Sequence, residues 1–381
     1  MNVLYIAFKD FSKLHFGASK KVISECRAME QAGHTVTLMG RNHNQTVTIT
    51  TDGALTKVNE HNPFPVAKLQ PLFDKKNEIR DVIAYIKDKT FDFCYIRYDL
   101  CDGDFMRMVK HIRQVCPTIY IEIPTYPYDK EYAGRVNGIR LKIDAHHAKK
   151  LKNYVSRIIT FYKIPDDSFY GIPCINVPNG FDFDEVELIR EDAVPATIEI
   201  AAVSSMRIWH GYERMIEGMH RYYAGGGTRN LILHLVGDGR ECGKYKALCD
   251  EYRLGDHVVF HGAMHGKELD NLLEQCTLGI DSLGRHRTGV DVLSSLKSRE
   301  YGAKGIPFIN SCKIDIVEED FPYMLQVPAD ESPVDVESVV SFFDKVYEGG
   351  SRLAVAKEVR AYIEHKSDMS AVMRQVLNTI E

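Results

Sequence analysis

Residues 294–311 read SSLKSREYGAKGIPFINS and contain one complete step from a helix to a strand. Ser294 and Ser295 are both good N-cap residues, so a helix is predicted to begin directly after them. Gly-Ile-Pro at 305–307 ends that helix, and the apolar residues that follow predict a short buried strand. Repetition of this step along a chain predicts a parallel β-sheet with helices on both faces.

The same step recurs in two successive blocks of the chain. A segment rich in acidic and turn residues, 175–197, separates them, and a chain of 381 residues is long for a single core. We therefore expect an α/β protein with two doubly wound, Rossmann-like parallel-sheet domains, covering residues 1–185 and 186–360. The main predicted strands cover residues 2–7, 35–40, 91–98, 118–124, 198–203, 231–237, 257–262, 278–284 and 306–310.

Composition narrows the class of protein. The net charge of −5 argues against a nucleic-acid-binding protein, which is usually basic. No apolar run approaches the roughly 18 residues of a membrane-spanning helix, and the N-terminus does not have the pattern of a signal peptide. The nine cysteines are scattered and form no C-x-x-C pair, which favours reduced thiols over a disulfide or zinc framework. We expect a cytoplasmic protein.

A first candidate site lies around the helix that follows Ser295. The free amides at a helix start, here after Ser294 and Ser295, favour an anion. The loop before it supplies Arg285 and Arg287, and Lys297 lies in the first helical turn. Glu300 follows where a carboxylate can accept hydrogen bonds from a pair of hydroxyls. Phosphate and diol together indicate a nucleotide, whereas the alternative is that Lys297, Arg299 and Glu300 are ordinary solvated charges.

The loop after the strand at 198–203 supplies a second candidate group. Arg207 and His210 lie in this strand-to-helix turn, and a cation there can share a diphosphate with the first group. The alternative is that His210 is a cap-region residue and that Trp209 is a packing anchor. Glycine turns at Gly237 and Gly262 follow the next two strands, and their exposed backbone suits hydrogen bonding to a nucleobase.

Taken together, these segments resemble retaining glycosyltransferases of the GT-B fold, and the closest group is the large bacterial family 4, also called group 1. The resemblance rests on the following motifs in this order: GASKKVISECRAMEQAGHTVTLMG, PNGFD, HGYERMIEG, LVGDG, VFHGAM and REYGAKGIPFI. It implies that the first domain binds the acceptor and that the second binds a nucleoside-diphosphate sugar across a cleft. It further implies that the last segment, 361–381, packs back on the first domain, and that catalysis needs no metal.

The resemblance also assigns roles to individual residues. Glu300 matches the second glutamate of the family's paired-glutamate motif, which holds the ribose hydroxyls. Gly17 matches the glycine of the first-domain loop that faces the donor phosphates, and Asn179-Gly180 matches the NG turn before the interdomain linker.

Other family positions are occupied differently in this sequence. The first glutamate falls on Val292, so the adjacent Asp291 is our candidate for orienting the donor sugar. The family's arginine and lysine at the diphosphate fall on Ser205 and His210. We expect Arg207 and Lys297 to replace these two charges and to stabilise the leaving diphosphate.

The acceptor site is expected in the loop after the strand at 118–124. The family often places a histidine there, whereas this chain has aromatic and acidic residues that suit sugar faces and hydroxyls. The alternative is a Pro-rich turn whose tyrosines pack on the next helix. His15 is a second candidate for this rim, and Asp129 is our guess for a catalytic base. The acceptor candidates are Thr125, Tyr126, Tyr128 and Glu131.

A basic, amphipathic helix is predicted within residues 139–158, running into another strand. It suits peripheral contact with an anionic membrane that presents a lipid-linked acceptor, although a core helix with a solvated basic face is the alternative.

We therefore expect an enzyme that transfers a sugar, with retention, from a nucleoside-diphosphate sugar to a carbohydrate or lipid-linked acceptor, as in polysaccharide synthesis. No cofactor or metal is expected. Two alternatives remain at this point, namely a sugar-nucleotide 2-epimerase of the same fold and a catalytically silent nucleotide-sugar-binding subunit.

Overall fold

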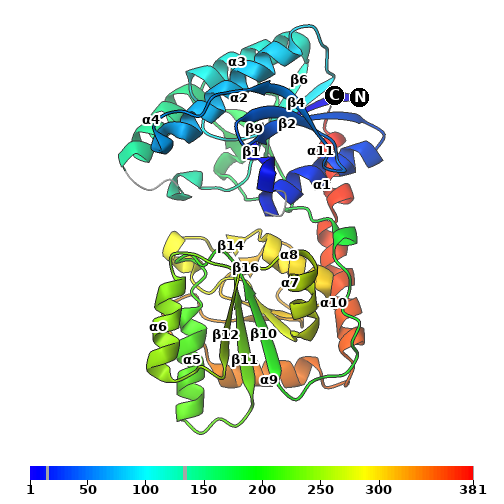
Figure 1. Cartoon of the computed structure of the whole chain (residues 1–381). Coiled ribbons are helices and arrows are strands. Elements are labelled where there is room, and N and C mark those ends of the chain that lie inside the picture. Colours follow the sequence, from blue (N-terminus) through cyan, green and yellow to red (C-terminus); the bar gives the residue numbers. More distant parts are fainter. Residues whose placement is uncertain (14–16, 132–134, 381) are drawn as a thin grey trace. The chain divides into compact units, whose positions relative to one another are not determined.

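A computed structural model describes residues 1–13, 17–131 and 135–380, and His15 lies outside these ranges. The contacts within the chain form two compact units (Figure 1). Unit 1 comprises Met1–Asp182 and Met369–Glu381, and unit 2 comprises Phe183–Asp368. Among the described residues, no helix is both long enough and apolar enough to cross a membrane.

The sheet of unit 1 has the strand order β4-β3-β2-β1-β5-β6-β7-β9-β8, and its central strands are parallel. Its two edges are antiparallel, because β3 and β4 form a hairpin on β2 and β8 pairs with β9. The strands are β1 (Asn2–Asp10), β2 (Thr35–Asn42), β3 (Gln45–Ile49), β4 (Leu55–Glu60), β5 (Phe93–Arg97), β6 (Thr118–Ile123), β7 (Arg157–Thr160), β8 (Ser168–Phe169) and β9 (Ile172–Asn176).

Both faces of this sheet are covered by helices. Successive side chains of β1 point to opposite faces, so β1 contributes to two hydrophobic cores. Leu4 and Ile6 pack in one core with α2 (Gln70–Ile86) and α3 (Gly103–Val115). Val3, Tyr5 and Ala7 pack in the other core with α1 (Gly17–Gln31) and α11 (Met369–Leu377), which lie side by side in Figure 1. The apolar sequence of β1 therefore reflects burial on both faces.

The basic helix of unit 1 is shorter than the sequence predicted. Helix α4 spans Arg135–Ala148, and a 3₁₀ turn and strand β7 follow it, so the expectation of a helix within 139–158 is wrong beyond Ala148. The apolar spacing that suggested a longer helix comes from Leu151, Val155 and Ile158, which are buried in the core of the unit.

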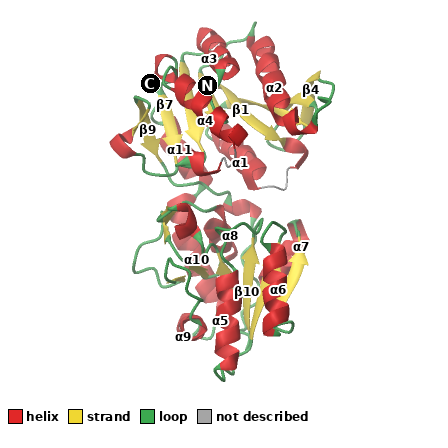
Figure 2. Cartoon of the chain, turned by 90° about the vertical axis from the view of Figure 1, so that its left-hand side faces the viewer, coloured by secondary structure: helices red, strands yellow, loops and turns green. Residues whose placement is uncertain are grey.

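Unit 2 has a parallel sheet with the strand order β12-β11-β10-β13-β15-β17. The order runs outward from β10 in both directions, so the topological switch point lies between β10 and β13. Figure 2 shows α5 (Glu213–Ala224) and α6 (Cys242–Tyr252) beside this sheet. The strands are β10 (Ile198–Val203), β11 (Leu231–Val236), β12 (Val258–Gly262), β13 (Leu278–Ile280), β15 (Phe308–Asn310) and β17 (Met324–Gln326), with β14 (Val292–Leu293) and β16 (Lys313–Ile314) in a separate pair.

The remaining helices of unit 2 complete its layers. Helix α8 packs against α10, and its Gly302 lies where a Cβ atom would meet the side chain of Ile363. No strand follows β17 within the described part of the chain, where the sequence predicted a helical tail. These helices are α7 (Gly266–Gln275), α8 (Leu296–Lys304), α9 (Val336–Val346) and α10 (Arg352–Ser367).

Candidate functional site

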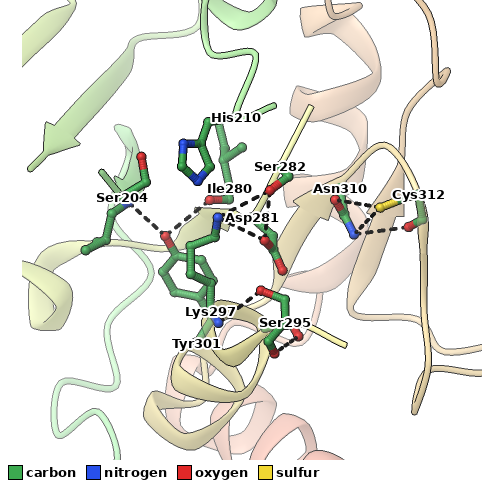
Figure 3. A network of polar contacts seen from close by, with 12 residues as sticks. Ser204, His210, Ile280, Asp281, Ser282, Ser295, Lys297, Tyr301, Asn310 and Cys312 are labelled. Carbon is green, nitrogen blue, oxygen red and sulfur yellow. Dashed lines mark hydrogen bonds and ion pairs between the residues drawn. The ribbon is translucent and has the colours of Figure 1, made fainter. Parts of the chain in front are cut away.

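Three of the residues singled out in the second half of the sequence, His210, Ser295 and Lys297, lie near one another at the switch point of unit 2. Ser204 follows β10, Asp281 and Ser282 follow β13, and Lys297 lies in the first turn of α8 (Figure 3). In open α/β sheets, ligands bind beyond the carboxyl ends of the strands at such a point. This position makes the group the candidate ligand site of unit 2.

Helix α8 is fixed in this place by its cap and by a buried tyrosine. The Ser295 hydroxyl accepts a hydrogen bond from the Lys297 amide at 3.1 Å, as the sequence predicted for an N-cap. The Tyr301 hydroxyl lies 3.1 Å from the carbonyl of Ala201 and 3.3 Å from that of Ile280, and so links α8 to two strands. These contacts hold the start of the helix against the strand ends.

The ammonium group of Lys297 lies 3.2 Å from a carboxylate oxygen of Asp281 and 3.2 Å from the Ser282 hydroxyl. Asp281 is 0% exposed, and its second oxygen, Oδ2, makes no hydrogen bond with any described residue. Burial lowers the pKa of Lys297, and its attraction to Asp281 opposes this shift. A partly buried cation beside a half-satisfied carboxylate can bind an anion and a hydroxyl of the same ligand.

His210 is held in the same group by the loop after β10. Its ring is 5% exposed, and Nδ1 accepts a hydrogen bond from the amide of Arg207 at 2.8 Å, so the ring is neutral. Burial strongly lowers the pKa of His210, and the charges of Lys297, Arg285 and Arg207 lower it further. His210 is therefore a buried neutral side chain, surrounded by cations.

The neutral state of His210 predicts a specific loss of stability in acid. The unfolded chain protonates this histidine below its usual pKa of 6.5, whereas the folded chain does not. Stability is therefore unaffected well above pH 6.5 and falls by about 1.4 kcal/mol for each pH unit below it. His210→Gln removes this contribution, so the difference between the two proteins in free energy of unfolding is expected to change with that slope.

Urea unfolding followed by the fluorescence of Trp209, the single tryptophan and a residue of unit 2, measures this difference. Parallel pH profiles of the wild type and His210→Gln would show that His210 is protonated in the folded state, contrary to this account.

Two glycines allow the loops of the site to approach one another. Gly211 has φ of 63°, and a Cβ atom there would lie 2.7 Å from the backbone nitrogen of Gly284. The loops after β10 and β13 are joined at this place, because the amide of Leu283 donates to the carbonyl of His210 at 2.8 Å. Gly237, after β11, has φ of 115°, and its Cβ atom would lie 1.9 Å from the Ser204 carbonyl oxygen.

Gly237→Ala is therefore expected to destabilise unit 2. The substitution combines a strained backbone conformation with a collision between backbone atoms, and we expect a loss of about 2 kcal/mol or more. Gly243→Ala, where a Cβ atom meets nothing within 4 Å, is the matched control in the first turns of α6. Equal urea midpoints for the two variants would contradict the close approach of Gly237 to Ser204.

The arginines of the loop after β13 divide into two roles. Arg287 makes ion pairs with Glu213 at 2.7 Å and with Glu331 at 2.5 Å, so this predicted donor residue is held by two carboxylates. Arg285 instead has its guanidinium 5.6 Å from the ring of Trp209, and its charge lowers the pKa of both His210 and Lys297. Arg285, which the sequence placed in this loop beside Arg287, is thus a cation of the site.

Arg299 does not belong to the candidate site. Its guanidinium is 0% exposed and contacts both carboxylate oxygens of Asp315, at 2.6 and 2.8 Å, and the Ser294 hydroxyl donates to the same carboxylate. The suggestion that Arg299 is a solvated surface charge is therefore wrong. Ser294, a predicted donor residue, lies in this buried network. Asp291, another predicted donor residue, is exposed, and its backbone carbonyl accepts a hydrogen bond from the amide of Lys313.

The other predicted donor residues are placed as follows. Glu300 is partly buried one turn after Lys297, and its charge raises the pKa of that lysine. Arg207 is partly buried in the loop of His210. Gly262 is exposed at the end of β12, and Gly17 is the first residue of α1 in unit 1.

In unit 1, the loop after β6 lines a cavity of about 350 Å³. Three of the predicted residues contribute to it, namely Tyr126, Tyr128 and Asp129, and Phe169 and Tyr170 also line it. The Tyr128 hydroxyl donates to the buried carboxylate of Asp144 at 2.5 Å, which holds the ring in place.

Two predicted acceptor residues are not among the described residues that line this cavity. Thr125 is partly buried but does not line the cavity, and the side chain of Glu131 lies outside the described residues. Phe169 and Tyr170 were not predicted, because they lie in and directly after β8, far from the loop after β6 in the sequence.

No model of a known protein family matches this sequence, and no curated protein matches it significantly. Solved structures do match over nearly the whole chain. Sucrose-phosphate synthase from Thermosynechococcus elongatus has a TM-score of 0.66 at 16% identity, covering 99% of this chain and 98% of its own. A glycosyltransferase from Rickettsia africae has a TM-score of 0.65 at 13% identity, covering 99% and 97%.

A third matching structure is that of Anabaena Alr3699/HepE in complex with UDP and glucose. It has a TM-score of 0.59 at 13% identity and covers 100% of this chain and 99% of its own. At such identities the likeness concerns the fold. The chain has the α/β architecture of GT-B glycosyltransferases, with two Rossmann-like domains, as the sequence predicted.

Proposed function

We propose that this protein transfers a sugar from a nucleoside-diphosphate sugar to a carbohydrate or lipid-linked hydroxyl. The observation that carries the proposal is the cationic group at the switch point of unit 2, where Lys297 and Arg285 surround the neutral His210. Solved structures of the same fold include a protein in complex with UDP and with UDP-glucose, which supports the same class of ligand.

In this proposal each charged residue of the site has one task. Lys297, Arg285 and Arg207 stabilise the negative charge that develops on the departing diphosphate, usually the largest single contribution to such catalysis. Glu300 accepts hydrogen bonds from the ribose hydroxyls. The free Oδ2 of Asp281 is a further acceptor for a donor hydroxyl.

We further propose that the anomeric configuration is retained and that no metal is needed, as the resemblance to family 4 implies. The three cations supply positive charge that a metal supplies in other enzymes. A chelator would then leave the rate unchanged, and the anomer of the product, identified by NMR, would be that of the donor.

The acceptor is proposed to bind in unit 1, in the cavity between Tyr126 and Tyr170. Aromatic rings beside a carboxylate, here Asp129, suit the apolar face and the hydroxyls of a sugar ring, and a volume of about 350 Å³ lies within the usual range of small-molecule sites. Tyr170→Ala is the variant that would raise the KM for an acceptor without changing nucleotide affinity.

The test is to incubate the full chain with nucleotide sugars carrying a labelled sugar, with and without a mixture of glycan acceptors. Label recovered in an acceptor product supports the transferase. Label recovered in an epimerised sugar without any acceptor supports the 2-epimerase alternative. Tight nucleotide-sugar binding without any product supports the silent subunit, and the transferase proposal then fails.

A further inference from the structure

We propose that a second cavity of unit 1, between α3 and α4, is a binding site for a phosphate group. It does not depend on the proposed transferase activity, because it uses none of the residues assigned to that reaction. The cavity has a volume of about 310 Å³, and its walls include Arg107, Lys110, His147, Lys150, Asn153 and Tyr154.

The walls of this cavity are positively charged. Three lining residues are permanent cations, and no carboxylate is among the described residues that line the cavity. The protein as a whole carries a net charge of −5, so a concave surface with only cations is a local exception. Such a surface concentrates field lines and attracts anions.

Among the described residues, Lys110 and Lys150 lack the carboxylate partners that other cations of unit 1 have. Lys21 pairs with Glu25 at 2.5 Å, and Arg41 pairs with Asp74 at 3.1 Å. By contrast, Lys110 and Lys150 make no ion pair with any described carboxylate.

The contacts that the two lysines do make are weak. The ammonium group of Lys110 lies 5.9 Å from the ring centre of Tyr154, and that of Lys150 lies 3.2 Å from Nε2 of His146. Neither contact neutralises the cation, so an external anion would be its first full counter-charge. Arg107 instead has a carboxylate partner on α3, Asp104, at 2.9 Å.

A mixture of hydrogen-bond donors surrounds the cavity. Burial lowers the pKa of His147, and the nearby charges of Lys150 and His146 lower it further, whereas those of Asp102 and Asp144 partly oppose the shift. Two ammonium groups, a guanidinium, an imidazole and the amide of Asn153 together offer more hydrogen-bond donors than a single carboxylate can accept. A tetrahedral phosphate, with up to two charges and several acceptor oxygens, matches this set.

The phosphate has two possible sources, namely a soluble phosphate compound and the headgroup of an anionic lipid. Helix α4 leaves Ile139 at 61% and Ile143 at 43% exposure, and helical spacing puts both on the side of His147, which lines the cavity. A lipid surface would cover these apolar side chains, whereas a soluble ligand would not.

The experiment has two arms and uses the full chain. In the first, inorganic phosphate is titrated while the amide and imidazole signals of residues 147–153 are followed by NMR. In the second, co-sedimentation is measured with vesicles of phosphatidylcholine alone and of phosphatidylcholine mixed with phosphatidylglycerol. Both arms compare the wild type with the double variant Lys110→Gln/Lys150→Gln, and with Lys87→Gln/Lys89→Gln at the exposed end of α2 as the charge-matched control.

Saturable shifts with inorganic phosphate that weaken about tenfold or more in Lys110→Gln/Lys150→Gln, but not in the control, support the site and a soluble source. Binding to the anionic vesicles only, lost in the same variant, supports the site and a lipid source. Absence of binding in both arms, or equal binding by both double variants, would overturn the proposal.

Discussion

Lys297→Ala is expected to lower kcat for sugar transfer by about a hundredfold or more, the largest effect on activity that the structure predicts. Its ammonium group is the partly buried cation at the start of α8, and removing one such charge-stabilising group typically costs between about a hundredfold and about a thousandfold. Initial rates with a saturating nucleotide sugar measure it. Lys345→Ala, an exposed lysine of α9, is the matched control and is expected to keep the wild-type rate.

The same substitution leaves Asp281 buried without its cation, so the fold of unit 2 needs a separate test. We expect Lys297→Ala to lose about 3 kcal/mol of unfolding free energy, as for other broken buried pairs. The double variant Lys297→Gln/Asp281→Asn replaces both charges with amides and is expected to recover most of this stability. If activity returned together with stability, Lys297 would be a structural residue and its proposed role at the diphosphate would be wrong.

Arg299→Met is expected to destabilise unit 2 by about 3 kcal/mol or more, the largest effect on stability in this account. The substitution removes a fully buried cation and leaves the carboxylate of Asp315 without its counter-charge, with only the Ser294 hydroxyl as a remaining donor among the described residues. Urea unfolding followed by Trp209 fluorescence reports on unit 2 and gives the change directly.

A double-mutant cycle with Asp315 separates a lost ion pair from a packing defect. Arg299→Met/Asp315→Leu removes both charges and is expected to be more stable than Arg299→Met alone. Wild-type stability of Arg299→Met would contradict the burial of this guanidinium and would return Arg299 to the class of solvated surface charges.

Lys297 and Arg299 are only two residues apart in the sequence, yet the predictions assign them different roles, one in the site and one in the stability of unit 2. An α-helix turns by about 100° per residue, so Lys297 and Arg299 face different sides of α8, whereas Lys297 and Glu300 share one side. The sequence therefore contained the information that Lys297 and Glu300 belong together. It did not contain the partner of Arg299, because Asp315 lies beyond the next strand.

The orientation of the two arginines before α8 could not be predicted from the sequence. Arg285 and Arg287 lie in a short 3₁₀ helix, in which residues two apart point in different directions. Only one of them can face the strand ends, and the choice depends on Glu213 and Glu331, which come from other elements and bind Arg287. Sequence spacing identified the loop and its two arginines, but it could not show that carboxylates of other elements bind Arg287.

The alternation of strands and helices was predictable because buried parallel strands are continuous apolar runs. The edge hairpin of unit 1 was missed, although β3 alternates polar and apolar residues and Asp52-Gly53 is a favoured hairpin turn. The second cavity of unit 1 has no sequence signature, since α3 and α4 bring together residues more than thirty positions apart.

The central claim is that unit 2 binds a nucleoside diphosphate at the switch point of its sheet. The most direct test is calorimetric titration of the full chain with UDP, GDP, dTDP, ADP and CDP, repeated with Lys297→Gln/Asp281→Asn and with Lys345→Ala. At least one nucleotide is expected to bind the wild type and Lys345→Ala with equal affinity. The same nucleotide is expected to bind the double variant at least about tenfold more weakly. Absence of binding by all five nucleotides, or equal binding by all three proteins, would contradict it.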